Sequence, residues 1–354
     1  MLTIDGSQKS GSGTIIRDAV AFSAITRIPI HVFNIRARRN PPGLRPQHLT
    51  VIRAIATLCN GSIHHATVGA TEIHFTPGSE IVGGEYTFDI GTAGSALMLA
   101  NALLLVALFA KTSSRFTLIG GLFQDFAPSA FHFQHVLLPL LHRMGINASV
   151  QIVRPGYVPK GNGKLVLTVS PVNQSLIPLE LQEQGEVQQI EGIALASRLK
   201  DRQVANRMAN TCIQELKQHQ FSPQIQLLED EPHHPAFQEV ALQPGAALAI
   251  WASTSSGGII GADMAGKKGR SSEFIGKQVA RMFLEDVASG AAVDRHLADQ
   301  WIPFAAFADG TSTVKVPTIS DHIASRLWLV KQFLPCNTAI HQQQIVVEGS
   351  GQLR

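Results

Sequence analysis

The sequence predicts an α/β fold in which a large domain of repeated α/β units carries a smaller inserted α/β domain. Strand-like runs alternate with helix-like runs, the pattern of chains that pack helices on one face of a sheet. Of the 354 residues, 45% are hydrophobic and 16% are charged, which provides enough apolar side chain for a large core. A change to a more polar texture after about residue 170 marks the expected insertion.

Strands are expected where β-branched and aromatic residues lie near glycine or proline, at 29–35, 72–75, 115–119 and 165–169. Helices are expected around 18–26, 46–58, 94–110 and 130–144. The last of these places apolar residues at helical spacing, at Val136, Leu137, Leu140 and Leu141. The recurrence is architectural, because no sequence repeat of fixed period accompanies it.

A polar stretch from Glu180 to about Leu242 opens the expected insertion. It contains a helix-like run at 202–220 and is followed by an apolar strand at 247–252 and a helix from about 271 to 289. We predict an inserted small α/β domain at 184–288. The large domain then comprises 1–183 plus 289–354.

Charge and cysteine content bear on partners and compartment. The formal net charge of +3 is too mild to indicate nucleic-acid binding by itself. Cys59, Cys212 and Cys336 are widely spaced and do not have metal-ligand spacing, as expected in a reducing compartment. The first residues lack the charged and apolar regions of a signal peptide, so we expect a cytoplasmic protein.

The most apolar segment, 96–110, needs a separate test against membrane insertion. It is interrupted by Asn101 and is shorter than the roughly 20 residues of a bilayer span. We therefore interpret it as a helix buried on most faces, and expect no membrane association.

Two loops have the composition of anion sites. The opening loop, 5–17, follows a short strand and enters a helix, so its small residues let backbone amides approach a phosphate. A plain structural turn explains this loop equally well. The loop at 36–50 gathers several arginines, whose guanidinium groups suit phosphate oxygens. A solvated basic turn is the alternative there.

At 91–95 the unpartnered amides of a helix's first turn can be satisfied by a bound anion or, as is more frequent, by simple capping. The basic segment 154–164 is explained by a solvated hairpin-like turn. Histidines occur in two helix-like segments, at 293–300 and 321–326. In the first, helical spacing places His296, Asp299 and Gln300 on one side. The absence of HExxH, paired CxxC and GxSxG motifs argues against metalloprotease, zinc-ribbon and α/β-hydrolase functions.

Taken together and in order, these segments resemble the RNA 3′-terminal phosphate cyclase family from Ile4 to about Pro335. The strongest pieces are PGLRPQHLT (42–50), FDIGTAGSA (88–96), PGYVPKGNGK (155–164), GKKGRSSEFIG (266–276), HLADQ (296–300) and the His322 helix with FLP (333–335). The resemblance implies a large domain of repeated βαβαββ-like units with a smaller inserted α/β domain. It also relates the fold to enolpyruvyl transferases, so the fold alone does not fix the function.

The resemblance implies ATP-dependent conversion of an RNA 3′-phosphate end to a 2′,3′-cyclic phosphate through adenylyl-histidine and RNA-adenylate intermediates. His322 matches the nucleophile. Asn101 matches a nucleotide-contacting glutamine, and the segment His296, Leu297, Ala298, Asp299 and Gln300 matches one that lines the ATP site. Gly13, Arg17, Arg38, Arg39 and Arg45 match positions suited to phosphate or RNA. The implied ligands are ATP, a divalent cation expected to be Mg²⁺, and RNA 3′-phosphate ends.

Some residues depart from the family pattern. Ser10 stands where the opening loop usually has an acidic residue that helps to hold a metal, and Thr14 stands where it has glutamine. Ser325-Arg326 replaces the usual Thr-Asn after the histidine. Asp125 is then a candidate replacement carboxylate, and the metal ligands are otherwise unassigned. A diverged RNA-binding or RNA-processing relative with weak catalysis remains the alternative, and the oligomeric state is left open.

Overall fold

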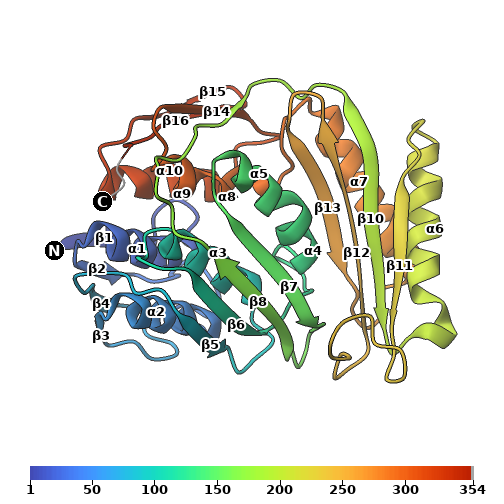
Figure 1. The fold of residues 1–354 in the computed structure, drawn as a ribbon, viewed down its shortest axis with the longest axis horizontal. Coiled ribbons are helices and arrows are strands. Elements are labelled where there is room, and N and C mark those ends of the chain that lie inside the picture. The colour runs from blue at the N-terminus through green and yellow to red at the C-terminus, as the bar shows by residue number, and fades with distance from the viewer. Residues whose placement is uncertain (352–354) are drawn as a thin grey trace.

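The computed structural model describes residues 1–351 and contains helices and four four-stranded sheets over that range (Figure 1). The α/β class predicted from the sequence is confirmed. Three of the sheets share one strand order, in which the fourth strand of the unit lies between the second and the third. In each of them the first two strands are parallel and the other pairs are antiparallel.

The first unit runs β1-α1-β2-α2-β3-β4 along the chain. Its elements are β1 (Leu2–Asp5), α1 (Gly13–Thr26), β2 (Ile30–Phe33), α2 (Pro46–Cys59), β3 (Ser62–His64) and β4 (Ile73–Thr76). The predicted strands at 29–35 and 72–75 and the predicted helix at 46–58 are therefore confirmed. The helix expected from residue 18 begins already at Gly13, because the Ser12 side chain accepts a hydrogen bond from the Thr14 amide and caps it.

The second unit repeats this order and contains a helical segment with one π turn. Its elements are β5 (Glu85–Asp89), α3 (Ala96–Ala107), β6 (Ser114–Gly120), α4 (Ala130–His132), η1 (Phe133–Leu137), α5 (Leu138–Arg143), β7 (Ala148–Arg154) and β8 (Gly163–Val169). The segment at 154–164 joins antiparallel neighbours β7 and β8, as the hairpin-like pattern predicts.

The third unit is interrupted after its first strand. Its elements are β9 (Glu180–Leu181), α8 (Leu297–Gln300), α9 (Ile302–Ala305), β14 (Thr311–Lys315), α10 (Asp321–Phe333), β15 (Thr338–His341) and β16 (Gln344–Glu348). Between β9 and α8 the chain forms β10 (Val187–Ser197), η2 (Lys200–Arg202), α6 (Val204–Lys217), β11 (Gln224–Asp230), β12 (Gly245–Thr254), β13 (Ile259–Ala265) and α7 (Ser272–Ala288).

The sheet formed by β10–β13 is buried on both faces. Along β12, Ala247 and Ala249 belong to the main hydrophobic core, whereas Leu248 and Ile250 belong to a second core with α6 and α7. This alternation explains why β12 is an almost continuous apolar run. Figure 1 shows this sheet and its two helices at one end of the long axis, with both chain termini at the other. The division at 184 and 288 stays a prediction.

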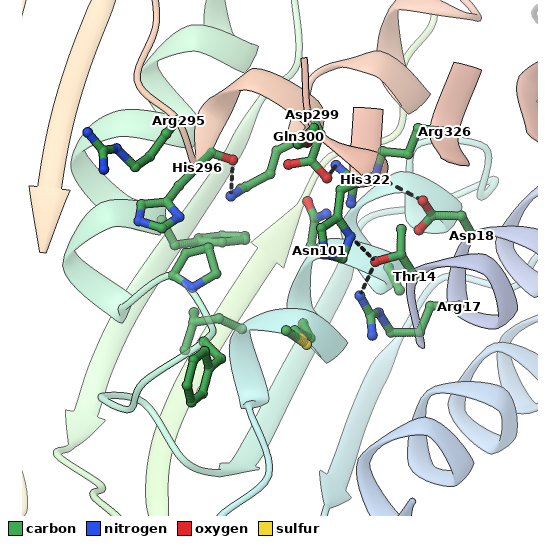
Figure 2. Close-up of a pocket in the computed structure, with 17 residues that line it drawn as sticks. Thr14, Arg17, Asp18, Asn101, Arg295, His296, Asp299, Gln300, His322 and Arg326 are labelled. Carbon is green, nitrogen blue, oxygen red and sulfur yellow. Dashed lines mark hydrogen bonds and ion pairs between the residues drawn. The ribbon is translucent and has the colours of Figure 1, made fainter. Parts of the chain in front are cut away.

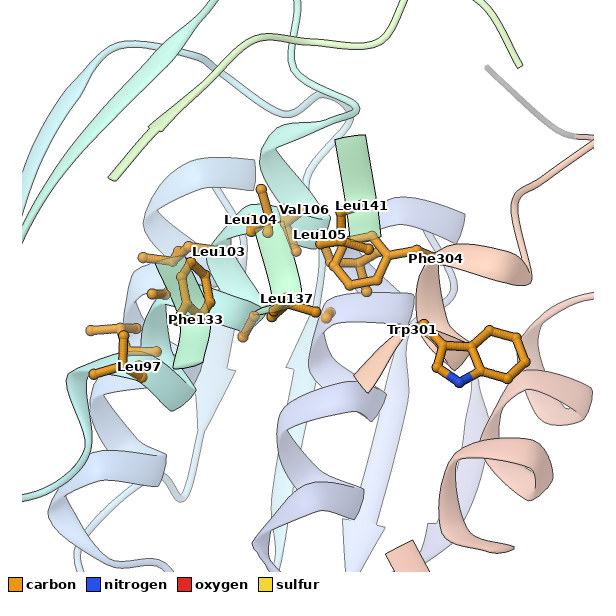
Figure 3. Close-up of a cluster of buried hydrophobic side chains, with 14 of the residues drawn as sticks. Leu97, Leu103, Leu104, Leu105, Val106, Phe133, Leu137, Leu141, Trp301 and Phe304 are labelled. Atoms are coloured by element: carbon orange, nitrogen blue, oxygen red, sulfur yellow. The ribbon is translucent and has the colours of Figure 1, made fainter. Parts of the chain in front are cut away.

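The main core is formed by helices enclosed by the three repeated sheets. Figure 3 shows leucines of α3 near Phe133, Leu137, Leu141 and Phe304, and Trp301 belongs to the same buried cluster farther along. Most of the apolar run at 96–110 is thus a buried helix of the core, as predicted, although the helix ends at Ala107, and Ser95 caps its first turn. Over residues 1–351, no helix combines the length and the hydropathy that a membrane crossing requires.

Replacing Leu104 by alanine tests this core directly. Leu104 is fully buried in α3, and its truncation removes packed methyl groups and leaves a cavity. We expect Leu104→Ala to lower the free energy of unfolding by about 2–5 kcal/mol in urea titrations followed by circular dichroism. Leu227→Ala is the control, because Leu227 is 46% exposed. Equal losses for the two variants would contradict the assignment of α3 to the core.

Candidate functional site

One pocket brings together the beginning of α1, the first half of α3, the α8 segment and the beginning of α10. Within it, His322 Nδ1 lies 3.0 Å from Thr14 Oγ1. Arg17 Nη2 donates a hydrogen bond of 3.2 Å to the same oxygen. Figure 2 shows Thr14 between the two side chains, so α1 fixes the ring of a histidine that belongs to α10.

The environment of His322 favours the neutral imidazole. Burial lowers the pKa of His322 below its ordinary value of 6.5, and the nearby guanidinium groups of Arg326 and Arg17 lower the pKa further. Asp299 opposes them. Thr14 Oγ1 can accept the proton of Nδ1, which leaves the lone pair on Nε2. Within residues 1–351, Nε2 makes no hydrogen bond, so that lone pair is available to a ligand.

Arg17 is a buried cation that is not neutralised by a direct partner. Its exposure is 8%, and across residues 1–351 no carboxylate comes within ion-pair distance of its guanidinium group. Burial lowers the pKa of Arg17 to about 10, which still leaves the side chain charged at neutral pH. Leaving a buried charge without a partner destabilises a protein by about 3–5 kcal/mol. An anionic ligand in the pocket would supply that partner.

Arg326, in contrast, is held by two carboxylates of the pocket. Its Nε donates to Asp18 Oδ2 at 2.9 Å, and its Nη1 lies 3.2 Å from Asp299 Oδ2. Arg326 is only 4% exposed, so these contacts balance its charge in a buried setting. The same network fixes Asp299 of the predicted 296–300 segment against α10.

Asn101 lies on α3 with its side chain in the pocket. Its Oδ1 atom is buried and accepts no hydrogen bond from residues 1–351. A buried amide oxygen without a donor is destabilising by about 1–3 kcal/mol, so this atom is suited to a ligand N–H group. Apolar side chains also line the pocket, contributed by Leu97, Met98, Ala102, Phe126, Pro128 and Phe133.

The 296–300 segment divides between the pocket and the core. His296, Asp299 and Gln300 line the pocket, whereas Leu297 and Ala298 are buried in the hydrophobic core. Asp294 anchors the segment, since its Oδ1 accepts from the amides of His296 and Leu297, each at 2.8 Å.

The anchor is itself fixed from the inserted sheet and from α4. Asp294 Oδ2 accepts from the Gly261 amide at 3.0 Å and lies 3.1 Å from His132 Nε2. Burial alone would raise the pKa of Asp294, but His132 and the backbone donors hold that pKa at about 2. Asp294 is therefore a carboxylate at neutral pH and keeps its capping role.

Gly13 begins α1 and allows a close approach of two side chains. A Cβ atom at this position would lie 2.1 Å from His48 Nε2 and 3.0 Å from Arg17 Nη1. His48 is buried, and desolvation together with neighbouring arginines lowers its pKa to about 2, so it is neutral. The role of Gly13 in the structure is thus to make room for His48 and Arg17.

The remaining predicted arginines lie outside the pocket. Arg38, Arg39 and Arg45 are exposed and do not line it. Arg38 Nη1 donates to the Lys9 carbonyl at 3.0 Å, which ties the arginine loop to the opening loop. The positive charge of Arg39 still contributes to the lowered pKa of His322, so this arginine lies within electrostatic reach of the pocket.

The residues in the pocket do not fit a cation held by protein ligands alone. In residues 1–351, no group of three or more His, Cys, Asp or Glu side chains converges on one point. The two lining carboxylates, Asp18 and Asp299, are both engaged by Arg326. Asp125, the candidate replacement carboxylate, does not line the pocket and is paired with Arg270 and Lys267, so its role toward a metal stays a prediction.

Sequence reasoning assigned no pocket role to Asp18, Arg295, Phe126 or Ser320, all of which line it. A signal for Asp18 was present, because Thr14, Arg17 and Asp18 follow the spacing of one helix face. The sequence predicted that this helix begins at residue 18, so the spacing of these three residues was not seen as helical. Phe126 had no such signal, since it lies in a loop whose path depends on distant partners.

The fold and the site define a class of protein: three βαβαββ units enclose a pocket in which a histidine with a lowered pKa lies beside a buried arginine. A family model for RNA 3′-terminal phosphate cyclase matches residues 8–340, and the chain belongs to that family. It is 34% identical over 345 residues to an RNA 3′-terminal phosphate cyclase of Methanopyrus kandleri, covering 97% of this chain and 96% of that protein.

Two further relatives carry the same description. The Pyrococcus furiosus protein is 37% identical over 335 residues, which covers 94% of this chain and 93% of the relative. The Nitrosospira multiformis protein is 36% identical over 343 residues, which covers 97% of this chain and 94% of the relative. The resemblance stated from the sequence motifs is confirmed over nearly the whole chain.

Electrostatic control of His322 can be measured by its titration in NMR spectra. Arg17→Gln removes a positive charge that disfavours the imidazolium form, so we expect the pKa of His322 to rise toward 6.5. Asp299→Asn removes a negative charge and should lower that pKa further. Arg53→Gln, an exposed change on α2, is the control and should leave the titration unchanged. An unchanged pKa in Arg17→Gln would show that this guanidinium does not act on His322.

Proposed function

We propose that this protein uses ATP to convert an RNA 3′-phosphate end to a 2′,3′-cyclic phosphate, with His322 as the nucleophile. The observation that carries the proposal is the trio of Thr14, Arg17 and His322. A neutral imidazole is held at Nδ1 and free at Nε2, beside a buried cation without a carboxylate partner. Family membership supports RNA as the substrate.

In the first step, the Nε2 lone pair attacks the α-phosphorus of ATP. The N–P bond forms as the P–O bond to pyrophosphate breaks, and the ring becomes a cation that keeps its proton on Nδ1. Thr14 Oγ1, 3.0 Å from Nδ1, accepts that proton in a hydrogen bond and so holds the ring in place. Arg17 offsets the negative charge of the phosphates.

In the second step, an oxygen of the RNA 3′-phosphate attacks the same phosphorus. The N–P bond breaks, AMP is transferred to the RNA, and His322 returns to the neutral imidazole. In the third step, the adjacent 2′-hydroxyl oxygen attacks the RNA phosphorus and AMP leaves, while the hydroxyl proton passes to solvent. Adenylation is needed because a phosphate dianion is a poor electrophile without a good leaving group.

ATP, the divalent cation and the cellular setting belong to the same proposal. Mg²⁺ commonly keeps several waters and binds through nucleotide phosphates, so we expect the cation to enter with ATP rather than in a protein cage. We assign RNA phosphate contacts to the exposed Arg38, Arg39 and Arg45. Three free, buried cysteines are in keeping with a cytoplasmic location.

The central experiment is covalent labelling with ATP that carries ³²P at the α-phosphate. We expect the wild-type protein to retain the label and His322→Asn to retain none, because the attacking nitrogen is lost. His341→Ala, an exposed histidine of β15, is the matched control and should label normally. The same preparations should turn an RNA 3′-phosphate into a product resistant to phosphatase.

Failure of the wild type to retain label would overturn the adenylyl-histidine mechanism. RNA binding that persists without ATP and without any labelling would instead identify a relative that has kept RNA affinity and lost the chemistry. Labelling of His322→Asn at the wild-type level would place the nucleophile elsewhere.

The rate of labelling should also depend on pH with a defined sign. Only the neutral form of His322 attacks, and its pKa lies below 6.5, so the rate should fall only as the pH drops below 6.5. We expect the half-maximal rate on the acid side at a pH below 6.5, measured by rapid quench with ATP far below its KM, where the profile reports the ligand-free protein. A midpoint above 6.5 would contradict the assignment of this limb to His322.

A further inference from the structure

Phe126 has an unusual exposure for a large aromatic residue. Its side chain is 101% exposed and yet lines the pocket with His296 and Pro128. Its backbone φ of 65° lies in the left-handed region, where a non-glycine residue loses about 1 kcal/mol or more of conformational free energy. The aromatic ring at the pocket is therefore both exposed and carried on a strained backbone, and both features are unfavourable for the protein without a ligand.

The loop that carries Phe126, residues 122–129, is fixed on both sides of its tip. Before the tip, Asp125 accepts a bidentate pair from Arg270, at 2.8 and 2.9 Å. After the tip, the Ser129 amide donates to Asp263 Oδ2 at 2.7 Å. Arg270 and Asp263 both belong to the 184–288 segment, so that segment determines where Phe126 lies.

The two ends of the pocket differ in chemistry. Charged and titratable groups gather around His322, with Arg17, Asp18, Asp299 and Arg326. The other end is lined by the apolar rings of Phe126, Pro128 and Phe133, together with His296 and Arg295. A ligand with a phosphate at one end and a flat, largely apolar ring system at the other matches this division.

We propose that Phe126 stacks on the base of the bound nucleotide and sets the affinity for it, and that the 184–288 segment contributes to nucleotide binding by holding the 122–129 loop. This inference rests on the proposed use of ATP. It gives the aromatic ring the contact area that it lacks in the free protein. It also gives the Asp125–Arg270 pair a role in positioning rather than in binding metal.

The test measures equilibrium binding of an ATP analogue with a methylene bridge between the α- and β-phosphates, which cannot transfer AMP. Loss of one aromatic stacking partner typically weakens binding by roughly five- to a hundredfold, so Phe126→Ala should raise Kd by about tenfold or more. Phe126→Trp should restore binding. Phe274→Ala, a change at a 47% exposed phenylalanine on α7, is the matched control and should bind like wild type.

A double-mutant cycle tests whether the Asp125–Arg270 pair positions Phe126. Arg270→Ala removes the bidentate pair and should weaken binding in the same direction, but add little in combination with Phe126→Ala. The control is Arg207→Ala, which removes another bidentate pair of the same segment, with Glu273 at 2.7 and 3.0 Å. Fully additive losses, or no loss in Arg270→Ala, would overturn the positioning role of the segment.

The two proposals fail in different ways. Wild-type protein that is labelled by ATP while Phe126→Ala binds the analogue normally would overturn the stacking role alone. Wild-type protein that neither binds the analogue nor is labelled would overturn the nucleotide function and the stacking role together. Affinity for an RNA 3′-phosphate oligonucleotide without nucleotide should be equal in wild type and Phe126→Ala; a matching loss there would assign the ring to RNA instead.

Discussion

The packing of α1 against α10 is the contact on which the site depends. Thr14 and His322 are separated by 308 residues in the chain, and their hydrogen bond exists only because the first and third units place these helices side by side. Ser10 and Ser325 meet at the same junction, with their hydroxyl oxygens 2.8 Å apart. A small rotation between the units would break both contacts and turn His322 away from Arg17.

Repetition of one unit explains how such a junction arises. Each unit packs its helices on one face of its sheet, so three units enclose their helices in a common core and bring helix N-termini together. The 184–288 segment enters between β9 and α8 of the third unit. Its sheet buries one face against the common core, and Asp263 and Gly261 on β13 reach residues near the pocket. The insertion is thereby structurally connected to the site.

The sequence predicted the elements better than the contacts between them. Alternating apolar patterns and turn residues were sufficient for β2, β4, β6, β8 and most helices, because these signals are local. Ordered motifs identified the family and pointed to His322. The partners of Thr14 and Arg326 could not be predicted, since their contacts span 308 residues and depend on how the units pack. The exposure of Phe126 depends likewise on anchors more than a hundred residues away.

The departures from the family pattern satisfy one another instead of leaving defects. Ser10 contacts Ser325, Thr14 contacts His322, and Arg326 is paired with Asp18 and Asp299. The charges of these two carboxylates also raise the pKa of Arg17, but neither carboxylate lies within ion-pair distance of it in residues 1–351. Arg17 is thus buried, charged and without an ion-pair partner in residues 1–351. Its guanidinium group lies beside a histidine whose pKa is lowered first by burial and then by neighbouring arginines, and an anionic ligand would supply the partner that Arg17 lacks.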